Sequence, residues 1–114
     1  MLIPLRNYSN YSICESNIKI EDLVNFAEKE KLPAMALTDY KLLSGALEFS
    51  TKCKNKGIQP IIGLDVDYIS KLNHKSRLTF LCKNEIGFKN LNILSTKINT
   101  ENEFHLSLNN INNF

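Results

Sequence analysis

Hydrophobic residues in the first half of the chain recur at helical spacing and then in a short apolar run. Residues 20–32 have apolar side chains at intervals of three and four, with Glu21 and Asp22 in the first turn. Acidic residues are favourable there because the helix dipole is positive at its N-terminus, so this pattern predicts an amphipathic helix. Pro33 then marks a break, and residues 34–38 predict a buried strand. The apolar face of the predicted helix comprises Ile20, Leu23, Val24, Ala27 and Leu32.

A second helix is predicted to end before Gly57, a residue that suits a left-handed C-terminal cap. Residues 58–69 then predict a strand. The adjacent pair Ile61 and Ile62 indicates that both faces of its first part are covered, while alternation after Gly63 indicates one exposed face in its second part. The apolar side of the second helix comprises Leu42, Leu43, Ala46, Leu47, Phe49 and Cys53.

Shorter patterns complete the predicted fold. Residues 2–5 and 78–82 are apolar runs that predict strands, and residues 86–98 predict a third helix. Residues 104–108 favour one more short strand. The order β-α-β-α-β-β-α is typical of an α/β fold with mostly parallel strands.

The end of the chain has a different composition. Residues 99–114 are rich in asparagine and have no usable period. The predicted strands are too few to close a small barrel, which needs about eight strands. We therefore expect residues 1–98 to form part of a larger domain and residues 99–114 to begin a truncated continuation of it.

Composition indicates one soluble unit. The chain has 114 residues, a net charge of +2 and 43% hydrophobic residues, without the surplus of basic residues that typifies nucleic-acid binding. No apolar run approaches the roughly 20 residues that span a bilayer, and the N-terminus lacks the pattern of a signal peptide. We expect a cytoplasmic location and no membrane partner. Cys14, Cys53 and Cys82 are widely spaced, so neither a disulfide framework nor a zinc site is expected.

Common catalytic patterns are missing from the sequence. It contains no G-x-S-x-G elbow, no P-loop and no G-x-G-x-x-G fingerprint. The two histidines, His74 in a polar stretch and His105 near the end, have no neighbours with metal-ligand spacing and are expected at the surface.

Five stretches, in register, carry a resemblance to a known family. They are L-R-N-Y-S-N-Y-S, L-P-A-M-A-L-T-D-Y, G-A-L-E-F, K-G-I-Q-P-I-I-G-L-D-V and L-C-K-N-E-I-G-F-K-N-L. Over about residues 3–95 the chain resembles the PHP (polymerase and histidinol phosphatase) domain at the N-terminus of bacterial DNA polymerase III alpha subunits. The resemblance implies the N-terminal part of a distorted TIM-like (β/α)7 barrel, with metal ions at the carboxyl ends of its strands.

The family's histidine ligands are replaced in this sequence. The resemblance places Arg6 and Tyr8 at the His-x-His positions that end the first strand. Tyr40 stands at the histidine of Thr-Asp-His, and Arg77 stands at a further histidine position. A zinc or manganese cluster needs neutral imidazoles as well as carboxylates, so the resemblance implies a degenerate site without bound metal and without a catalytic residue.

Acidic residues remain at three family positions, Glu15, Asp39 and Asp65. We expect the arginines at the histidine positions to repel divalent cations and to pair with Glu15 and Asp65 by charge-assisted hydrogen bonds. Plainer alternatives stay open. Arg6 faces solvent in one of them, Asp39 is a helix N-cap in another, and Asp65 lies on a solvent-facing strand side in a third.

The resemblance implies a role in DNA replication. The parent would be a DNA-directed DNA polymerase, a nucleotidyltransferase that uses magnesium, while this fragment would be a non-catalytic scaffold without a cofactor. Its partners would be the rest of the alpha subunit, the proofreading exonuclease subunit and, through the parent, DNA. Two alternatives are a metal-dependent phosphoesterase of the histidinol phosphatase kind, against which the missing histidines argue, and a free-standing interaction protein.

Overall fold

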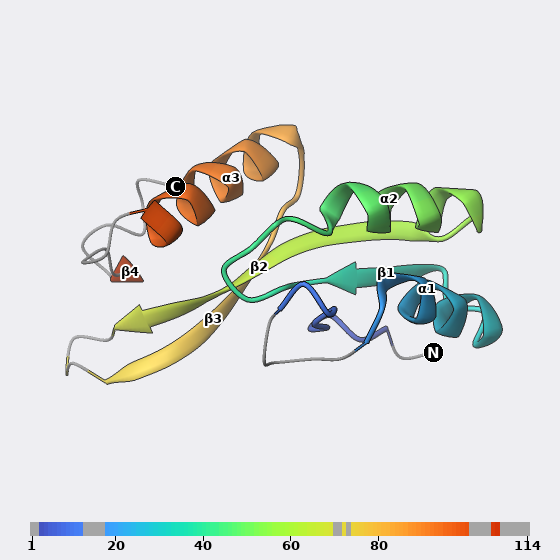
Figure 1. The fold of residues 1–114 in the computed structure, drawn as a ribbon, viewed down its shortest axis with the longest axis horizontal. Coiled ribbons are helices and arrows are strands. Elements are labelled where there is room, and N and C mark those ends of the chain that lie inside the picture. Colours follow the sequence, from blue (N-terminus) through green and yellow to red (C-terminus); the bar gives the residue numbers. More distant parts are fainter. Residues whose placement is uncertain (1–2, 13–17, 70–71, 73, 101–105, 108–114) are drawn as a thin grey trace.

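One long strand, β2, organises the molecule (Figure 1). The computed structural model describes residues 3–12, 18–69, 72, 74–100 and 106–107. Figure 1 shows α1, α2 and β1 packed near the start of β2, and α3 and β4 near its end. The elements are α1 (Ile20–Lys29), β1 (Ala34–Leu37), α2 (Ala46–Asn55), β2 (Gln59–Ile69), β3 (Lys75–Leu81), α3 (Glu85–Thr100) and β4 (Leu106–Ser107).

The predicted helices are confirmed, with two errors in the second, its start and the side assigned to Leu47. Helix α1 buries the apolar face that its spacing predicted, and Gly57 has a φ of 71°, the left-handed conformation expected after α2. Helix α2 begins only at Ala46, so Leu42 and Leu43 lie before it. Leu47 was wrongly placed on the buried side. Its residue is 80% exposed, because it lies on the face of α2 opposite Phe49 and Cys53.

The sheet is mixed rather than mostly parallel. Strand β1 runs parallel to the first part of β2, from the pair Ala34 and Gln59 to the pair Leu37 and Ile62. The longest ladder is antiparallel and joins the second part of β2 to β3, from Gly63 opposite Leu81 to Ile69 opposite Lys75. Strand β4 adds a short parallel pairing with β2. The prediction of mostly parallel strands was therefore wrong, because β2 and β3, which are close together in the sequence, pair antiparallel.

The predicted strand at residues 2–5 is not formed in its described part, residues 3–5. Pro4 has no N–H group for a ladder. Asn7 joins this segment to β1 instead, because its backbone oxygen accepts from the N–H of Thr38 at 2.8 Å and its side-chain amide donates to the Ala36 oxygen at 2.9 Å. The N-terminal segment is thus attached by a few specific hydrogen bonds.

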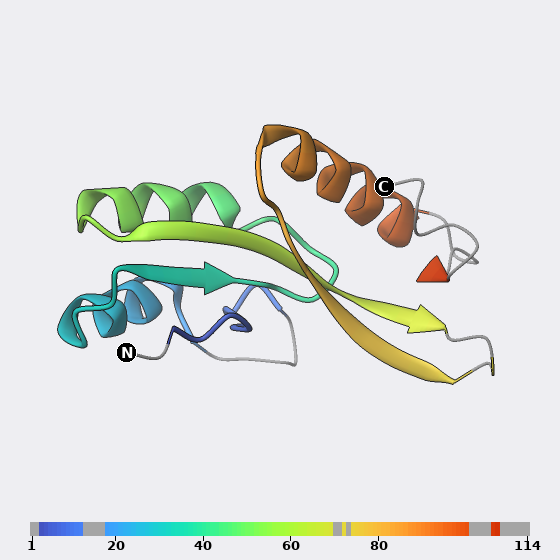
Figure 2. The same ribbon diagram turned by 180° about the vertical axis from the view of Figure 1, so that it is seen from behind.

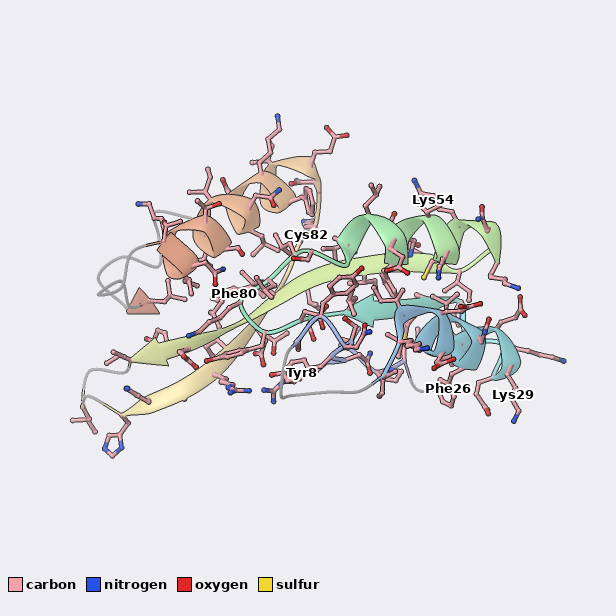
Figure 3. The ribbon with its side chains drawn as sticks, viewed as in Figure 1. Tyr8, Phe26, Lys29, Lys54, Phe80 and Cys82 are labelled. Carbon is pink, nitrogen blue, oxygen red and sulfur yellow. The ribbon has the colours of Figure 1, made fainter. Side chains whose placement is uncertain are left out.

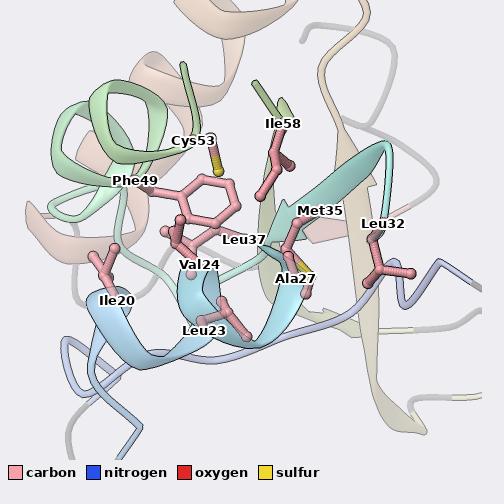
Figure 4. Close-up of a cluster of buried hydrophobic side chains, with 10 residues drawn as sticks. All are labelled: Ile20, Leu23, Val24, Ala27, Leu32, Met35, Leu37, Phe49, Cys53 and Ile58. Carbon is pink, nitrogen blue, oxygen red and sulfur yellow. The ribbon is translucent and has the colours of Figure 1, made fainter. Parts of the chain in front are cut away.

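Two hydrophobic clusters lie at the two ends of β2 (Figure 2). Figure 4 shows the first cluster, in which Phe49 and Cys53 of α2 face side chains of α1 and β1, among them Val24 and Met35. In the second cluster α3 covers the far part of β2. The second cluster comprises Leu64, Val66, Leu91, Leu94 and Leu106, with Leu43, Tyr68, Phe80, Cys82 and Ile98 packed against it.

None of the described helices is both long and apolar enough to cross a membrane.

Candidate functional site

The middle of β2 gathers the polar residues that the resemblance singled out. Beyond β1 the chain stays beside β2, and Tyr40 forms a parallel bridge with Asp65. On the antiparallel side, Thr79 lies opposite Asp65 and Arg77 lies opposite Asp67. Side chains from the N-terminal segment, from the residues after β1 and from β3 converge on two carboxylates of β2. We call this group the polar cluster. It comprises Arg6, Tyr8, Tyr40, Lys41, Asp65, Asp67, Arg77 and Thr79.

Asp65 is fully buried, with 0% of its side chain exposed. Nη2 of Arg6 donates to its Oδ2 at 2.8 Å, and the hydroxyl of Tyr8 donates to the same oxygen. The other oxygen, Oδ1, accepts from Oγ1 of Thr79 at 2.9 Å. Both carboxylate oxygens are thus engaged with protein donors. The expectation of an exposed face after Gly63 was wrong at Asp65, because residues of the N-terminal segment cover it.

Arginine side chains approach this group from the solvent side. The side chain of Arg6 is 56% exposed, yet its guanidinium reaches the buried carboxylate, so the expected pairing of Arg6 with Asp65 is present. Tyr8 lies between two arginines, since its hydroxyl oxygen is 3.1 Å from Nη2 of Arg6 and 3.3 Å from Nη1 of Arg77. Figure 3 shows Tyr8 on the side of β2 away from α3.

Asp67 is the second anionic centre of the cluster. Its Oδ2 accepts from the hydroxyl of Tyr40 at 2.6 Å and lies 3.2 Å from Nζ of Lys41. Nε of Arg77 lies 3.8 Å from its Oδ1, and the same guanidinium stacks 3.9 Å from the centre of the Tyr40 ring. Arg77 thus forms an ion pair with Asp67. A cation over an aromatic face adds to the attraction of the charge pair.

These contacts shift three pKa values. Partial burial, and then the hydrogen bond to the Asp67 carboxylate, raise the pKa of Tyr40 above 10.0. Burial alone would raise the pKa of Asp67, but hydrogen bonds from Tyr40 and Lys41, with the charges of Lys41 and Arg77, lower it below 3.8. Burial alone would lower the pKa of Lys41, but its contacts with Tyr40 and Asp67 raise it. All three shifts favour the paired state seen here.

Asp39 binds the N-terminal segment. It is 2% exposed and accepts from the backbone N–H of Ser9 at 2.5 Å, from Oγ of Ser9 at 2.7 Å and from Oγ of Ser12 at 2.8 Å. Oγ of Ser12 in turn accepts from the N–H of Tyr40 at 2.9 Å. The helix N-cap alternative for Asp39 is wrong, because α2 begins at Ala46 and its N-cap is Gly45. Glu15 lies outside the described residues.

Several partners of these carboxylates were missed from the sequence. Thr79 was detectable in principle, since the antiparallel register of a hairpin places it opposite Asp65. Ser9 and Ser12 are ordinary loop residues, and no local signal links them to Asp39, about thirty positions away. Lys41 has a positive φ of 61° although it is not glycine, and the local sequence does not predict this backbone conformation.

Metal-binding groups are sparse in the described part of the chain. Within it, no three histidine, cysteine, aspartate or glutamate residues lie close enough together to hold a metal ion. His74 is exposed at the start of the hairpin's second strand, as expected for a surface residue. Cys53 is fully buried, and burial raises its pKa to about 11, which suppresses the reactive thiolate.

Comparison with known proteins identifies the class. The family model of the PHP domain matches residues 4–112, and this chain belongs to that family. The chain is 40% identical over 114 residues to a DNA polymerase III subunit alpha of Chlamydia pneumoniae, with 90% of this chain covered. It is 38% identical over 97 residues to the protein of that name from Buchnera aphidicola, with 83% covered. It spans only 9% and 8% of the lengths of these two relatives.

Solved structures share the fold. One is an amidohydrolase from Chromobacterium violaceum with bound sulfate and no metal, at a TM-score of 0.63 and 20% identity. Another is described as a putative metal-dependent phosphoesterase from Bifidobacterium adolescentis, at a TM-score of 0.63 and 15% identity. In each case 80% of this chain aligns with 32% of the other chain. This likeness concerns the fold alone.

Proposed function

We propose that this chain is the PHP module of a replicative DNA polymerase III alpha subunit and acts as a scaffold in DNA replication. The observation that carries the proposal is the 40% identity, across 90% of the chain, to a subunit of that name. Template-directed synthesis and its magnesium ions then belong to parts of the parent outside this chain. The main partner is the rest of the alpha subunit, followed by the proofreading exonuclease subunit and, through the parent, DNA.

The second part of the proposal is that the polar cluster is a former metal site closed by ion pairs. Arg6, Tyr8, Tyr40 and Arg77 occupy positions where the family has histidine ligands. The residues present do not fit a divalent metal. Asp65 is the one fully buried carboxylate of the cluster, and both its oxygens already accept from protein donors. Three fixed positive charges nearby, from Arg6, Lys41 and Arg77, raise the cost of bringing a dication close.

The closed site has a structural task in this proposal. Residues 3–12 have no ladder of their own, and they are held by Asp39, just beyond β1, and by Asp65, in the middle of β2. Charge-assisted hydrogen bonds take the place that metal–carboxylate bonds have in an intact site. These bonds fix the N-terminal segment over the two buried carboxylates, and a scaffold needs such a fixed surface.

The family fold supports a further step of the proposal, that this chain supplies the first part of a (β/α)7 barrel. In the fold comparison 80% of this chain aligns with only 32% of each of two larger solved chains. On this view the continuation begins around residues 99–114, and further strands of the parent complete the barrel.

The native size of the protein tests the proposed function. An antibody against residues 46–55, or mass spectrometry of peptides from a size-fractionated lysate of the source cells, finds the polypeptide that contains this sequence. We expect a polypeptide many times larger than 13.0 kDa. A stable product near 13.0 kDa would instead favour a free-standing protein and would remove the polymerase role.

A further inference from the structure

The residue that joins the polar cluster to helix α3 has an unusual backbone conformation. Lys41 has a φ of 61°, in the left-handed region that side chains with a Cβ atom disfavour. It is neither glycine nor asparagine, the residues that adopt this region most readily. Such a conformation persists only where its surroundings determine it.

Helix α3 supplies part of those surroundings. The carbonyl oxygen of Lys41 accepts from Oγ of Ser95 at 2.7 Å and from Nδ2 of Asn99 at 2.7 Å. The two donors are one turn apart on α3, and Nδ2 of Asn99 also donates to the Ser95 oxygen at 2.8 Å. They therefore form a clamp of fixed geometry, which lies 54 and 58 positions along the chain from Lys41.

The other groups of Lys41 contact the polar cluster. Its backbone N–H donates to the backbone carbonyl oxygen of Asp65 at 2.8 Å. Its Nζ lies 3.2 Å from Oδ2 of Asp67 and 5.0 Å from the centre of the Tyr40 ring. One residue thus touches α3 through its carbonyl and the cluster through its N–H and its amine.

We propose that Lys41 is a conformational joint, through which the position of α3 sets whether the polar cluster is closed. With α3 in place, the clamp on the carbonyl stabilises the left-handed backbone, and this backbone directs the N–H toward β2 and the amine toward Asp67. When α3 moves away, the carbonyl loses both partners and the left-handed conformation loses its support. Lys41 then leaves Asp65 and Asp67, and the cluster opens on that side.

Helix α3 has one face on the sheet and one face toward solvent. Ile86 and Ile93 are 70% and 51% exposed, while Leu91 and Leu94 on the same helix face the sheet. The joint is a property of this chain and does not depend on which protein contains it.

Amide hydrogen exchange at residue 41, resolved to single residues by mass spectrometry of the 114-residue chain, tests the joint. The test variant is Ser95→Ala with Asn99→Ala, which removes both donors of the clamp. We expect exchange of the Lys41 amide to become about tenfold faster, in line with the loss of two hydrogen bonds. The matched control is Thr96→Ala with Thr100→Ala, because those hydroxyls donate only to oxygens of α3 itself, at 2.8 and 2.7 Å.

A rescue variant separates the joint from a general loosening of the fold. Adding Lys41→Gly to the clamp variant should restore slow exchange at position 41, since glycine adopts the left-handed region without help. Equal acceleration in the Thr96 and Thr100 control, or no acceleration in the clamp variant, would overturn the proposal. If the double variant fails to fold, Asn99→Ala alone should give a smaller acceleration in the same direction, and an unchanged rate would count against the joint.

Discussion

Nη2 of Arg6, at the start of the chain, lies 2.8 Å from Oδ2 of Asp65, a buried carboxylate in the middle of the longest strand. Fifty-nine positions separate the two residues in sequence. A partly exposed guanidinium reaches inward to a carboxylate that has no contact with solvent. The pair fixes the N-terminal segment on the sheet, where no strand ladder does so.

Replacing Asp65 should be costly. Asp65→Asn removes a charged acceptor from Arg6 and Tyr8 inside the fold, and we expect the free energy of unfolding to fall by about 2 kcal/mol. Asp67→Asn is the matched control. The side chain of Asp67 is 41% exposed, and this variant should cost less than about 1 kcal/mol because solvent screens its pairs. Urea denaturation followed by circular dichroism measures both. Equal losses of unfolding free energy in the two variants would show that the burial of Asp65 does not add to the stability that its contacts give.

The pH dependence of stability should report the contacts of Asp67. Its pKa is lowered on folding, so its contribution is present above pH 3.8 and is lost as the pH falls through the lower folded pKa. The difference in stability between the wild type and Asp67→Asn should therefore shrink below about pH 4. Denaturation curves at several pH values measure it. A difference that stays constant down to the acid limit would contradict these contacts.

The phenol of Tyr40 should give stability a pH dependence of the opposite sign. Its folded pKa is raised, so its contribution is fully present below pH 10.0 and is lost as the pH rises through the folded pKa. In Asp67→Asn the pKa of Tyr40 should fall, because the hydrogen bond to the Asp67 carboxylate and its negative charge both raise it. Titration of ¹³C-labelled tyrosine, with Tyr40→Phe to assign the signal, measures the shift. An unchanged pKa would show that the 2.6 Å hydrogen bond is not formed in solution.

Gly63 should tolerate no side chain. A Cβ atom there would lie 2.5 Å from the backbone oxygen of Phe80 and 2.8 Å from Cγ2 of Thr38. Because backbone cannot move aside cheaply, Gly63→Ala should destabilise the fold by about 2 kcal/mol or more. Gly87→Ala is the control, since its nearest neighbour is the Cys82 Cβ at 3.4 Å and alanine favours the helix. Thermal denaturation that finds the two variants equally stable would refute this close approach.

Sequence patterns predicted the elements that local periodicity determines. Helix α1 and the cap at Gly57 follow from apolar spacing and from the conformational freedom of glycine, both of which are local properties. The hairpin of β2 and β3 was misread as part of a mostly parallel sheet, because strand direction depends on the connection and not on composition. The apolar run at residues 2–5 suggested a strand, but in its described part Pro4 and the contacts of Asn7 decide otherwise.

The site was predictable to the extent that it rests on family positions. The positions of Arg6 and Asp65 follow from the resemblance, and their pairing follows from opposite charge. The burial of Asp65 was not predictable from alternation, which treats each strand face as wholly exposed or wholly covered. It results from the N-terminal segment, whose Arg6 and Tyr8 side chains reach Asp65. The clamp on Lys41 depends on side chains more than fifty positions away and has no local signature.

Manganese titration followed by NMR tests the central claim, that ion pairs have closed the former metal site. Bound Mn²⁺ broadens the amide signals of nearby residues, so the spectrum reports where the ion binds in the 114-residue chain. We predict no saturable broadening centred on Asp39, Asp65 and Asp67, and no chelator-sensitive hydrolysis of phosphate esters with manganese or zinc. Saturable broadening at these residues, abolished by Asp65→Asn or by a chelator, would contradict the claim and would restore a metal-dependent site to this domain.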